Sequence, residues 1–308
     1  MKIKSFFMFL SLFMAAAVIF TGCFFNKKLK GAIPGFESGG KDLKKSIAVI
    51  FADNSSKSDI KKILYKVKEN FLPEISEDCD DIILLEDKKG EIAAEFLSLP
   101  VLYSNNYDNL FLVPAGRRLG LNAAVFISVD FVSKRRSTGF FMFKKYVNFS
   151  VIEVSAVVYD MGAGAKLLDK VFSGEVEQEY DDFAQVSDAE NQIDFSEYED
   201  IIIDIAEDAA EEVCEAIEAG EWKSYIITRD ENKAIIFAGN KIGLTEGDIL
   251  NIYDSNSTVQ SSDTQHFFIP GIKVGTLKIT STDKDTSQAV ILSGEENISV
   301  GNIVKYAE

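Results

Sequence analysis

The spacing of apolar residues after residue 45 alternates between two periods, and each period predicts a different element. Residues 46–52 form a nearly continuous apolar run, which is typical of a strand covered on both faces. Turn and capping residues follow at 53–56, and then come apolar positions at helical spacing: Ile60, Ile63, Leu64, Val67 and Phe71. The first predicted unit is therefore a strand followed by a helix.

This alternation continues to residue 220. We expect further strands at 81–85, 123–132, 146–159 and 166–179, and further helices at 91–97, 107–119 and 198–219. The last helix combines an apolar stripe with an acidic opposite face and stops at Gly220. The pattern predicts a mixed α/β domain over residues 46–220.

Residues 221–308 have a different pattern, in which short β runs are separated by glycines. Glycines between short strands are expected at the tight corners of a small all-β barrel. Residues 244–250 and 298–304 share one arrangement, in which Gly247 and Gly301 are each followed by Asp or Asn and two apolar residues. We expect the glycine to adopt a positive φ and the polar side chain to bind the turn backbone before a strand begins.

The N-terminus has the composition of a leader. Lys2 and Lys4 precede an apolar segment at 6–20, which is shorter than the roughly 20 residues that a membrane-spanning helix needs. It ends in Thr21-Gly22-Cys23, which resembles the lipobox of bacterial lipoproteins. The resemblance implies cleavage after residue 22 and acylation of Cys23. An ordinary secretory leader with a chance cysteine is the alternative.

Residues 23–45 mix Gly, Pro and Ser with six lysines and lack periodicity, so we expect a lipidated tether. Its lysines would favour anionic headgroups, although a merely solvated linker fits equally well. No acidic residue follows Cys23 directly, which favours the periplasmic face of the outer membrane in hosts that sort lipoproteins by an aspartate there.

The net charge of −17 argues against a nucleic-acid partner, because phosphate binding requires clustered Lys and Arg. Residues 175–218 hold 18 Asp and Glu and no Lys or Arg. The stretch at 188–193 lacks the glycine of a calcium-binding EF-hand loop, so a solvated acidic face is expected there and no metal. Gly162 and Gly164 lie between two predicted strands rather than between a strand and a helix, so no nucleotide or other cofactor is expected.

Residues for catalysis are scarce, and we expect no enzyme. His266 is the single histidine, and no pattern supplies a partner that would make it a general base. Cys79 and Cys214 could pair in an oxidising envelope. The sequence does not establish the short separation that a disulfide needs, and two buried thiols are the favoured interpretation.

Residues 134–145 combine cations with large apolar side chains, and this combination suits a lipid interface or an acidic partner. The candidate contact residues are Arg135, Arg136, Phe140, Phe141, Phe143, Lys144 and Lys145. The alternative is a long hairpin whose alternate side chains face the core.

The order of elements over residues 46–219 resembles the periplasmic α/β domain shared by the Tol translocation protein, the curli-secretion lipoproteins and flagellar assembly protein T. The resemblance rests on SIAVIFADN, AGRRLGLNAAVFISV and VIEVSAVVYDMGAGAKLLDKVFSGEVE. Residues 223–306 resemble the C-terminal domain of flagellar assembly protein T, through AGNKIGLTEGDILNIYD, GIKVGTLKITSTDKDTSQAVI and SVGNIV.

These families imply binding or assembly rather than catalysis. We expect an envelope lipoprotein, membrane-bound through Cys23, that contacts other envelope proteins in a flagellar or secretion machine. The alternatives are an activator of a cell-wall synthase and a subunit of a curli-like secretion channel.

Overall fold

The fold is taken from a computed structural model that describes most of the chain after residue 40. The described residues are 41–53, 58–87, 89–102, 106–138, 145–178, 198–269 and 271–307, with only the backbone given at 133–138, 145–148 and 177–178. They belong to one compact unit, Gly40–Glu308. No helix in these ranges is both long and apolar enough to cross a membrane.

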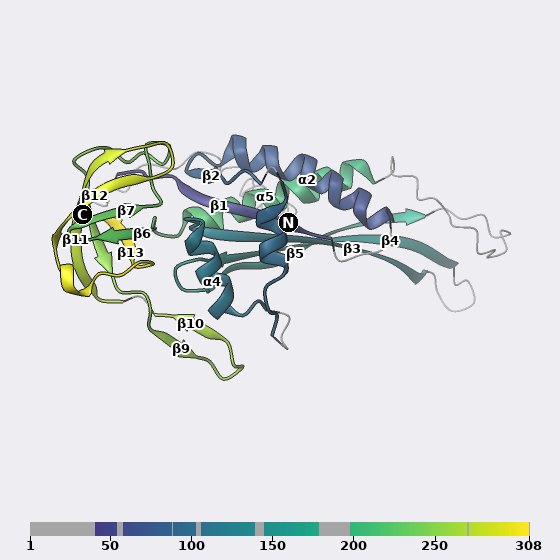
Figure 1. Cartoon of the computed structure of the whole chain (residues 1–308). Helices are drawn as coiled ribbons and strands as arrows, with labels where there is room; N and C mark the ends of the chain where they lie inside the picture. The colour runs from purple at the N-terminus through teal and green to yellow at the C-terminus, as the bar shows by residue number, and fades with distance from the viewer. Residues whose placement is uncertain are drawn as a thin grey trace, which may run out of the picture. The chain divides into compact units, whose positions relative to one another are not determined.

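A five-stranded mixed sheet forms the first part of this unit, in the order β2-β1-β3-β4-β5 (Figure 1). The strands are β1 (Lys45–Ala52), β2 (Ile82–Leu84), β3 (Ala123–Thr138), β4 (Lys145–Asp160) and β5 (Lys166–Gln178). β1 runs parallel to both β2 and β3, and the pairs β3–β4 and β4–β5 are antiparallel. The predicted α/β class is confirmed.

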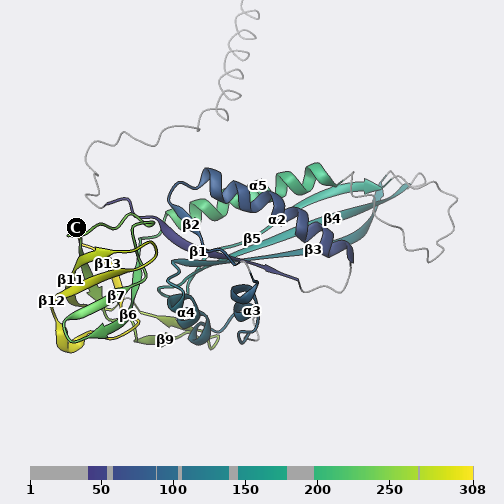
Figure 2. The ribbon, with the colours of Figure 1, turned by 45° about the horizontal axis from the view of Figure 1, so that its top comes forward.

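Two helices cover one face of this sheet, α2 (Ser58–Asp78) and α5 (Glu199–Glu218) (Figure 2). Their apolar stripes meet the side chains of alternate strand residues such as Val125, Ile127 and Val154. Phe71 of α2 is fully buried in this cluster, as its helical spacing predicted. The shared core is built from one stripe of each helix and one face of the sheet.

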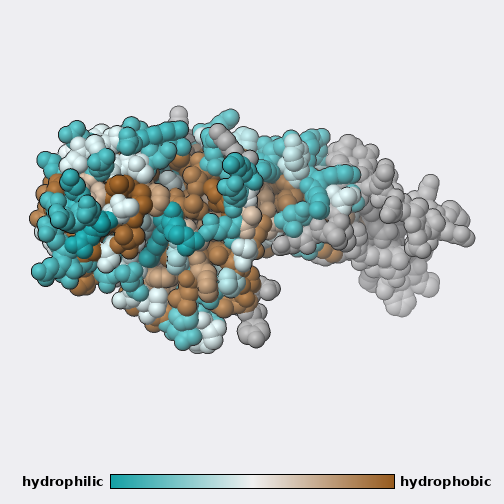
Figure 3. Space-filling view, viewed as in Figure 1, coloured by the Kyte–Doolittle hydropathy of each residue, from teal (hydrophilic) through white to brown (hydrophobic). Residues whose placement is uncertain are grey.

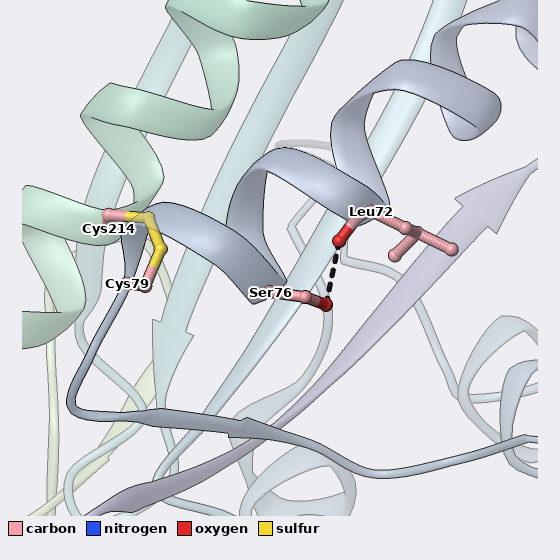
Figure 4. The surroundings of a disulfide bond; sticks show 4 residues. All are labelled: Leu72, Ser76, Cys79 and Cys214. Carbon is pink, nitrogen blue, oxygen red and sulfur yellow. Dashed lines mark hydrogen bonds between the residues drawn. A yellow bond between two sulfur atoms is a disulfide. The ribbon is translucent and has the colours of Figure 1, made fainter.

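A disulfide joins the same two helices (Figure 4). Cys79 directly follows α2 and bonds to Cys214 in α5, with 5.9 Å between their Cα atoms. The favoured interpretation of two free thiols is therefore wrong, although both cysteines are buried as expected. The pairing depends on α2 and α5 lying side by side, which their sequence separation of 135 residues conceals.

The opposite face of the sheet packs against α3 (Glu91–Leu97) and α4 (Asn109–Arg118) (Figure 2). Phe126 lies at the centre of an aromatic cluster, with its ring centroid 4.4 Å from that of Tyr107 and 5.8 Å from that of Tyr159. Barrel residues complete this core, because Tyr225 and Ile303 belong to the same cluster.

Six strands after residue 220 close into a barrel in the order β11-β12-β7-β6-β13-β8, which confirms the predicted small β-barrel. They are β6 (Ser224–Asp230), β7 (Lys233–Ile236), β8 (Ile249–Tyr253), β11 (Lys273–Thr282), β12 (Ser287–Ser293) and β13 (Ile303–Tyr306). The hairpin of β9 (Thr258–Gln260) and β10 (His266–Phe268) forms a separate two-stranded sheet.

The two glycine turns of the barrel have the predicted construction. Gly247 and Gly301 both adopt positive φ, 97° and 86°. The Asp248 carboxylate accepts a hydrogen bond from the Thr245 N–H, and the Asn302 amide oxygen accepts one from Ser299. In both turns the polar side chain thus fixes the corner from which the next strand, β8 or β13, begins.

The strand β3 extends further than the sequence pattern suggested, to Thr138 instead of residue 132, whereas β4 has nearly the predicted bounds. Their pairing continues without a break from Ala123 opposite Asp160 to Thr138 opposite Lys145. At about 3.4 Å per residue, the far end of β3 lies roughly 50 Å from its start. The described residues of the basic and aromatic segment, 134–138 and 145, therefore lie on this long antiparallel pair, and residues 139–144 are outside the described residues.

Candidate functional site

Buried polar side chains gather where the end of the sheet meets the barrel, and we call this region the seam. Its members are Asn109, Arg117, Asn122, Asp160, Lys223, Ser255 and Gln265. They come from α4, from the start of β3, from the β4–β5 turn and from barrel loops. The seam is the main concentration of buried polar side chains among the described residues, and it is the candidate site.

Arg117 in the last turn of α4 is the central residue of the seam. Its guanidinium donates hydrogen bonds to the carbonyl oxygens of Met161 (3.2 Å), Gly162 (2.6 Å) and Ser255 (3.0 Å), and to the Ser255 hydroxyl (3.2 Å). The guanidinium carbon lies 4.6 Å from the centroid of the Phe268 ring. Burial lowers the pKa of Arg117, but an arginine remains protonated. Its charge is therefore stabilised by backbone dipoles and an aromatic face rather than by a bound carboxylate.

A second cluster holds the β9–β10 hairpin against the start of α4. Asp108 caps that helix by accepting a hydrogen bond from the Leu110 N–H. Asn109 donates through its side-chain nitrogen to the carbonyl oxygens of Gly164 (2.9 Å) and His266 (2.6 Å). The Gln265 amide completes the cluster, because it donates to the Tyr107 carbonyl at 2.7 Å.

A third cluster joins the sheet to the first barrel strand. The Asn122 side chain accepts from the Ser46 N–H (2.9 Å) and donates to the Lys223 carbonyl (2.8 Å). The Lys223 ammonium forms an ion pair with Asp160, and each side chain is 13% exposed. Asp160 also accepts from the Ala163 N–H, so one carboxylate fixes both the β4–β5 turn and the approach to β6.

The chain enters the described unit through a clamp made of Lys41, Leu43, Lys44 and Lys45. The Lys41 ammonium lies 2.7 Å from the Asp248 carboxylate and also donates to Thr245. Leu43 is buried in the barrel core, and Lys45 donates to the carbonyl oxygens of Ile217 and Glu218 at the end of α5. The first described residues thus bind both the barrel and the end of α5.

The chemistry available in the seam is that of structural polar contacts. Its charged and amide groups bind neighbouring backbone or side chains of this chain, as detailed above. Some buried atoms have no hydrogen-bond partner among the described residues, including the Tyr225 hydroxyl and His266 Nδ1. Burial raises the pKa of Tyr225, so that hydroxyl stays protonated at neutral pH. In the described ranges no group of three His, Cys, Asp or Glu could hold a metal ion.

The structure places only some of the predicted contact residues. Arg135, Arg136 and Lys145 lie on the paired strands β3 and β4, opposite Asn148, Val147 and Thr138. The remaining predictions, Cys23, Phe140, Phe141, Phe143 and Lys144, lie outside the described residues. His266 begins β10, and only its backbone carbonyl and N–H contribute to the seam.

Sequence reasoning missed Arg117, although a signal was present. Val113 and Arg117 are four residues apart in α4 and both are buried, so the arginine occupies the apolar face of a helix. A charged residue on such a face is unusual unless it has specific partners. Exposed apolar residues also lie nearby, Leu110 and Phe111 on α4 and Val259 on β9, and Figure 3 shows hydrophobic residues over this part of the surface.

Comparisons with known proteins add little to this description. No protein-family model and no curated protein matches the sequence. Among solved structures, a hypothetical protein from Chlamydia trachomatis matches 57% of this chain and 99% of its own, at 11% identity and a TM-score of 0.33. A minor lipoprotein from Acinetobacter baumannii matches 56% of this chain and 93% of its own, at 13% identity and a TM-score of 0.28. Likenesses this weak do not test the lipobox at Cys23, and the resemblance to the Tol, curli and flagellar domains stays a prediction.

Proposed function

We propose that this chain is a non-catalytic lipoprotein of the bacterial envelope that binds other envelope proteins within a larger assembly. The observation that carries the proposal is Thr21-Gly22-Cys23 at the end of an apolar segment of 15 residues. Acyl chains on Cys23 would hold the mature chain on a membrane, since each buried CH₂ contributes about 0.8 kcal/mol. The periplasmic face of the outer membrane is the proposed location.

The organisation of the described unit supports a binding role. The buried charges of the seam contact the chain itself, and they connect the sheet to the barrel instead of surrounding a reactive group. Such a connection presents two β-structures as one rigid body, which suits a module that positions partners.

The long β3–β4 hairpin is the proposed partner contact. Lys41 enters at the end of the sheet where β1 and β3 begin, whereas the cations at 134–136 and 145 lie near the other end of β3 and β4. A separation of roughly 50 Å along β3 would place these residues well away from the point where the tether arrives. Because these residues are cationic, an acidic envelope protein is the expected partner class.

Replacement of Cys23 tests the anchor. Cys23→Ser should abolish metabolic palmitate labelling and release the protein from the membrane fraction, whereas Thr21→Ser should retain both because the residue stays small. Palmitate labelling that persists in Cys23→Ser would contradict the proposal.

Crosslinking in cells tests the binding role. A photo-crosslinking amino acid at position 137, in the hairpin, should capture a specific envelope protein, and a matched probe at Glu212 on α5 should not. Loss of the crosslinked product in an Arg135→Glu and Arg136→Glu variant would support an acidic partner. An unchanged product would contradict it.

A further inference from the structure

The outer surface of four barrel strands carries aliphatic and cationic side chains together. Ile249 of β8 pairs with Lys278 of β11, which in turn pairs with Val290 of β12, and Val290 pairs with Lys233 of β7. Ile235 and Leu292 extend the row, and we call the whole set the barrel face: Lys233, Ile235, Ile249, Lys278, Val290 and Leu292. Neighbours along each strand, such as Leu250 and Leu277, point inward and are fully buried.

Several of these aliphatic side chains are unusually exposed for strand residues. The exposed fractions are 36% for Ile235, 43% for Ile249 and 53% for Leu292. Directly paired residues on one side of a sheet lie about 5 Å apart, so the row from Ile249 to Lys233 is continuous. Aliphatic side chains mixed with lysines are suited to the interface between headgroups and acyl chains.

We infer that the barrel face lies against the anionic surface of the bilayer that holds Cys23. This inference deepens the proposed function and rests on it, because it takes Cys23 as the anchor. Two observations favour a lipid surface over other occupants: the position where the chain from Cys23 arrives, and the distribution of charge.

The chain from Cys23 arrives at the edge of the barrel face. Residues 24–40 separate Cys23 from Lys41, and the Lys41 ammonium is bound by the carboxylate of Asp248. Asp248 directly precedes Ile249, the first residue of the row. The clamp therefore joins the anchored segment to the strand end where the face begins.

The distribution of charge also favours an orientation in which the barrel face lies toward the bilayer. The barrel face contributes two lysines and no carboxylate, with Asp230 opposite Lys233 at one margin. In contrast, the exposed side of α5 carries seven acidic residues: Glu199, Asp200, Asp204, Glu207, Asp208, Glu211 and Glu215. An anionic bilayer repels that helix and attracts the two lysines, so of these two surfaces the barrel face is the one that can approach the bilayer.

The test measures which side of the full mature chain approaches lipid. A fluorescent amino acid is placed at Gln288, which is exposed and pairs with Ile235, or at Glu211 on α5 as the matched control. The protein is held on vesicles of phosphatidylethanolamine and phosphatidylglycerol that contain a quencher-bearing lipid. One arm uses lipidated Cys23, and the other uses a histidine tag in place of the lipid, on nickel-chelating headgroups.

Quenching should be several-fold stronger at 288 than at 211 in both arms. Lys233→Glu combined with Lys278→Glu should remove the difference, whereas Lys61→Glu combined with Lys62→Glu, two exposed lysines of α2, should preserve it. A Cys23 chain that fails to float with vesicles would overturn the proposed function alone. Equal quenching at 288 and 211 in the nickel-held arm would overturn the assignment of the barrel face.

Discussion

The two faces of the five-stranded sheet have different neighbours and are held by different interactions. On one face, α2 and α5 contribute a continuous apolar cluster and a disulfide. On the other, an aromatic cluster gives way to the seam, where Arg117, Asn109 and Asn122 bind backbone groups across the boundary with the barrel. The first arrangement depends on area buried, and the second depends on the geometry of individual hydrogen bonds.

The difference bears on how each region tolerates change. An apolar cluster distributes its free energy over many contacts, and one smaller side chain leaves most of them intact. A buried hydrogen-bond network loses a donor and strands its acceptors at the same time. The contacts of the seam should therefore open before the helix-covered face unfolds, and three experiments test this expectation.

The largest effect is expected on the helix-covered face, from removal of the disulfide. Cys79→Ser combined with Cys214→Ser should lower the free energy of unfolding by about 4 kcal/mol, because the bond closes a long loop in the unfolded chain. Urea denaturation with and without reductant measures it. The reductant should leave the double variant unchanged, and two titratable thiols in the untreated native protein would contradict the pairing.

A somewhat smaller effect is expected in the seam. Arg117→Met keeps the approximate volume of the side chain but removes the donors for Met161, Gly162 and Ser255, at a cost of about 2 kcal/mol in stability. Hydrogen exchange should show loss of protection first at Phe268, whose N–H is bound by the Ala163 carbonyl.

The control for the seam is the neighbouring arginine. The Arg118 side chain is 65% exposed and pairs with Glu95 on the surface, so Arg118→Met should change stability by no more than about 0.5 kcal/mol. An equal loss of stability in Arg117→Met and Arg118→Met would show that the hydrogen bonds of the seam do not contribute more than a surface ion pair.

The smallest effect concerns the clamp and depends on pH. Desolvation raises the pKa of Asp248, but hydrogen bonds from Lys41 and Thr245 outweigh it and leave the pKa lowered. Because the folded pKa lies below the unfolded value of about 3.9, this carboxylate stabilises the fold above that pH. The stabilisation is lost as the pH falls through the folded pKa.

Asp248→Asn should therefore lower the urea midpoint at pH 7 and approach the parent protein in acid. Asp285→Asn, an exposed change in the β11–β12 turn, is the control and should follow the parent at every pH. A constant gap between Asp248→Asn and the parent would rule out the ionised carboxylate as its cause.

Local pattern was sufficient for most of the fold. The helix at residues 91–97 has the predicted bounds, and the glycine turns at Gly247 and Gly301 form as expected, because caps, turns and periodicity act between near neighbours. The strand β3 runs further than predicted, since Lys134, Arg135 and Arg136 interrupt the apolar pattern while the backbone pairing continues. Strand pairing needs backbone groups only, and the composition of a strand does not reveal its end.

The local sequence pattern was enough to give the alternation of strands and helices, the barrel with its corners, and the acidity of α5, and it predicts the leader with Cys23. The tertiary structure alone decided that Cys79 meets Cys214, that Arg117 is buried against the barrel, and that Lys41 clamps Asp248 beside the barrel face. These contacts join residues 135 or more positions apart, and the local period of a chain carries no record of which distant surfaces will pack together.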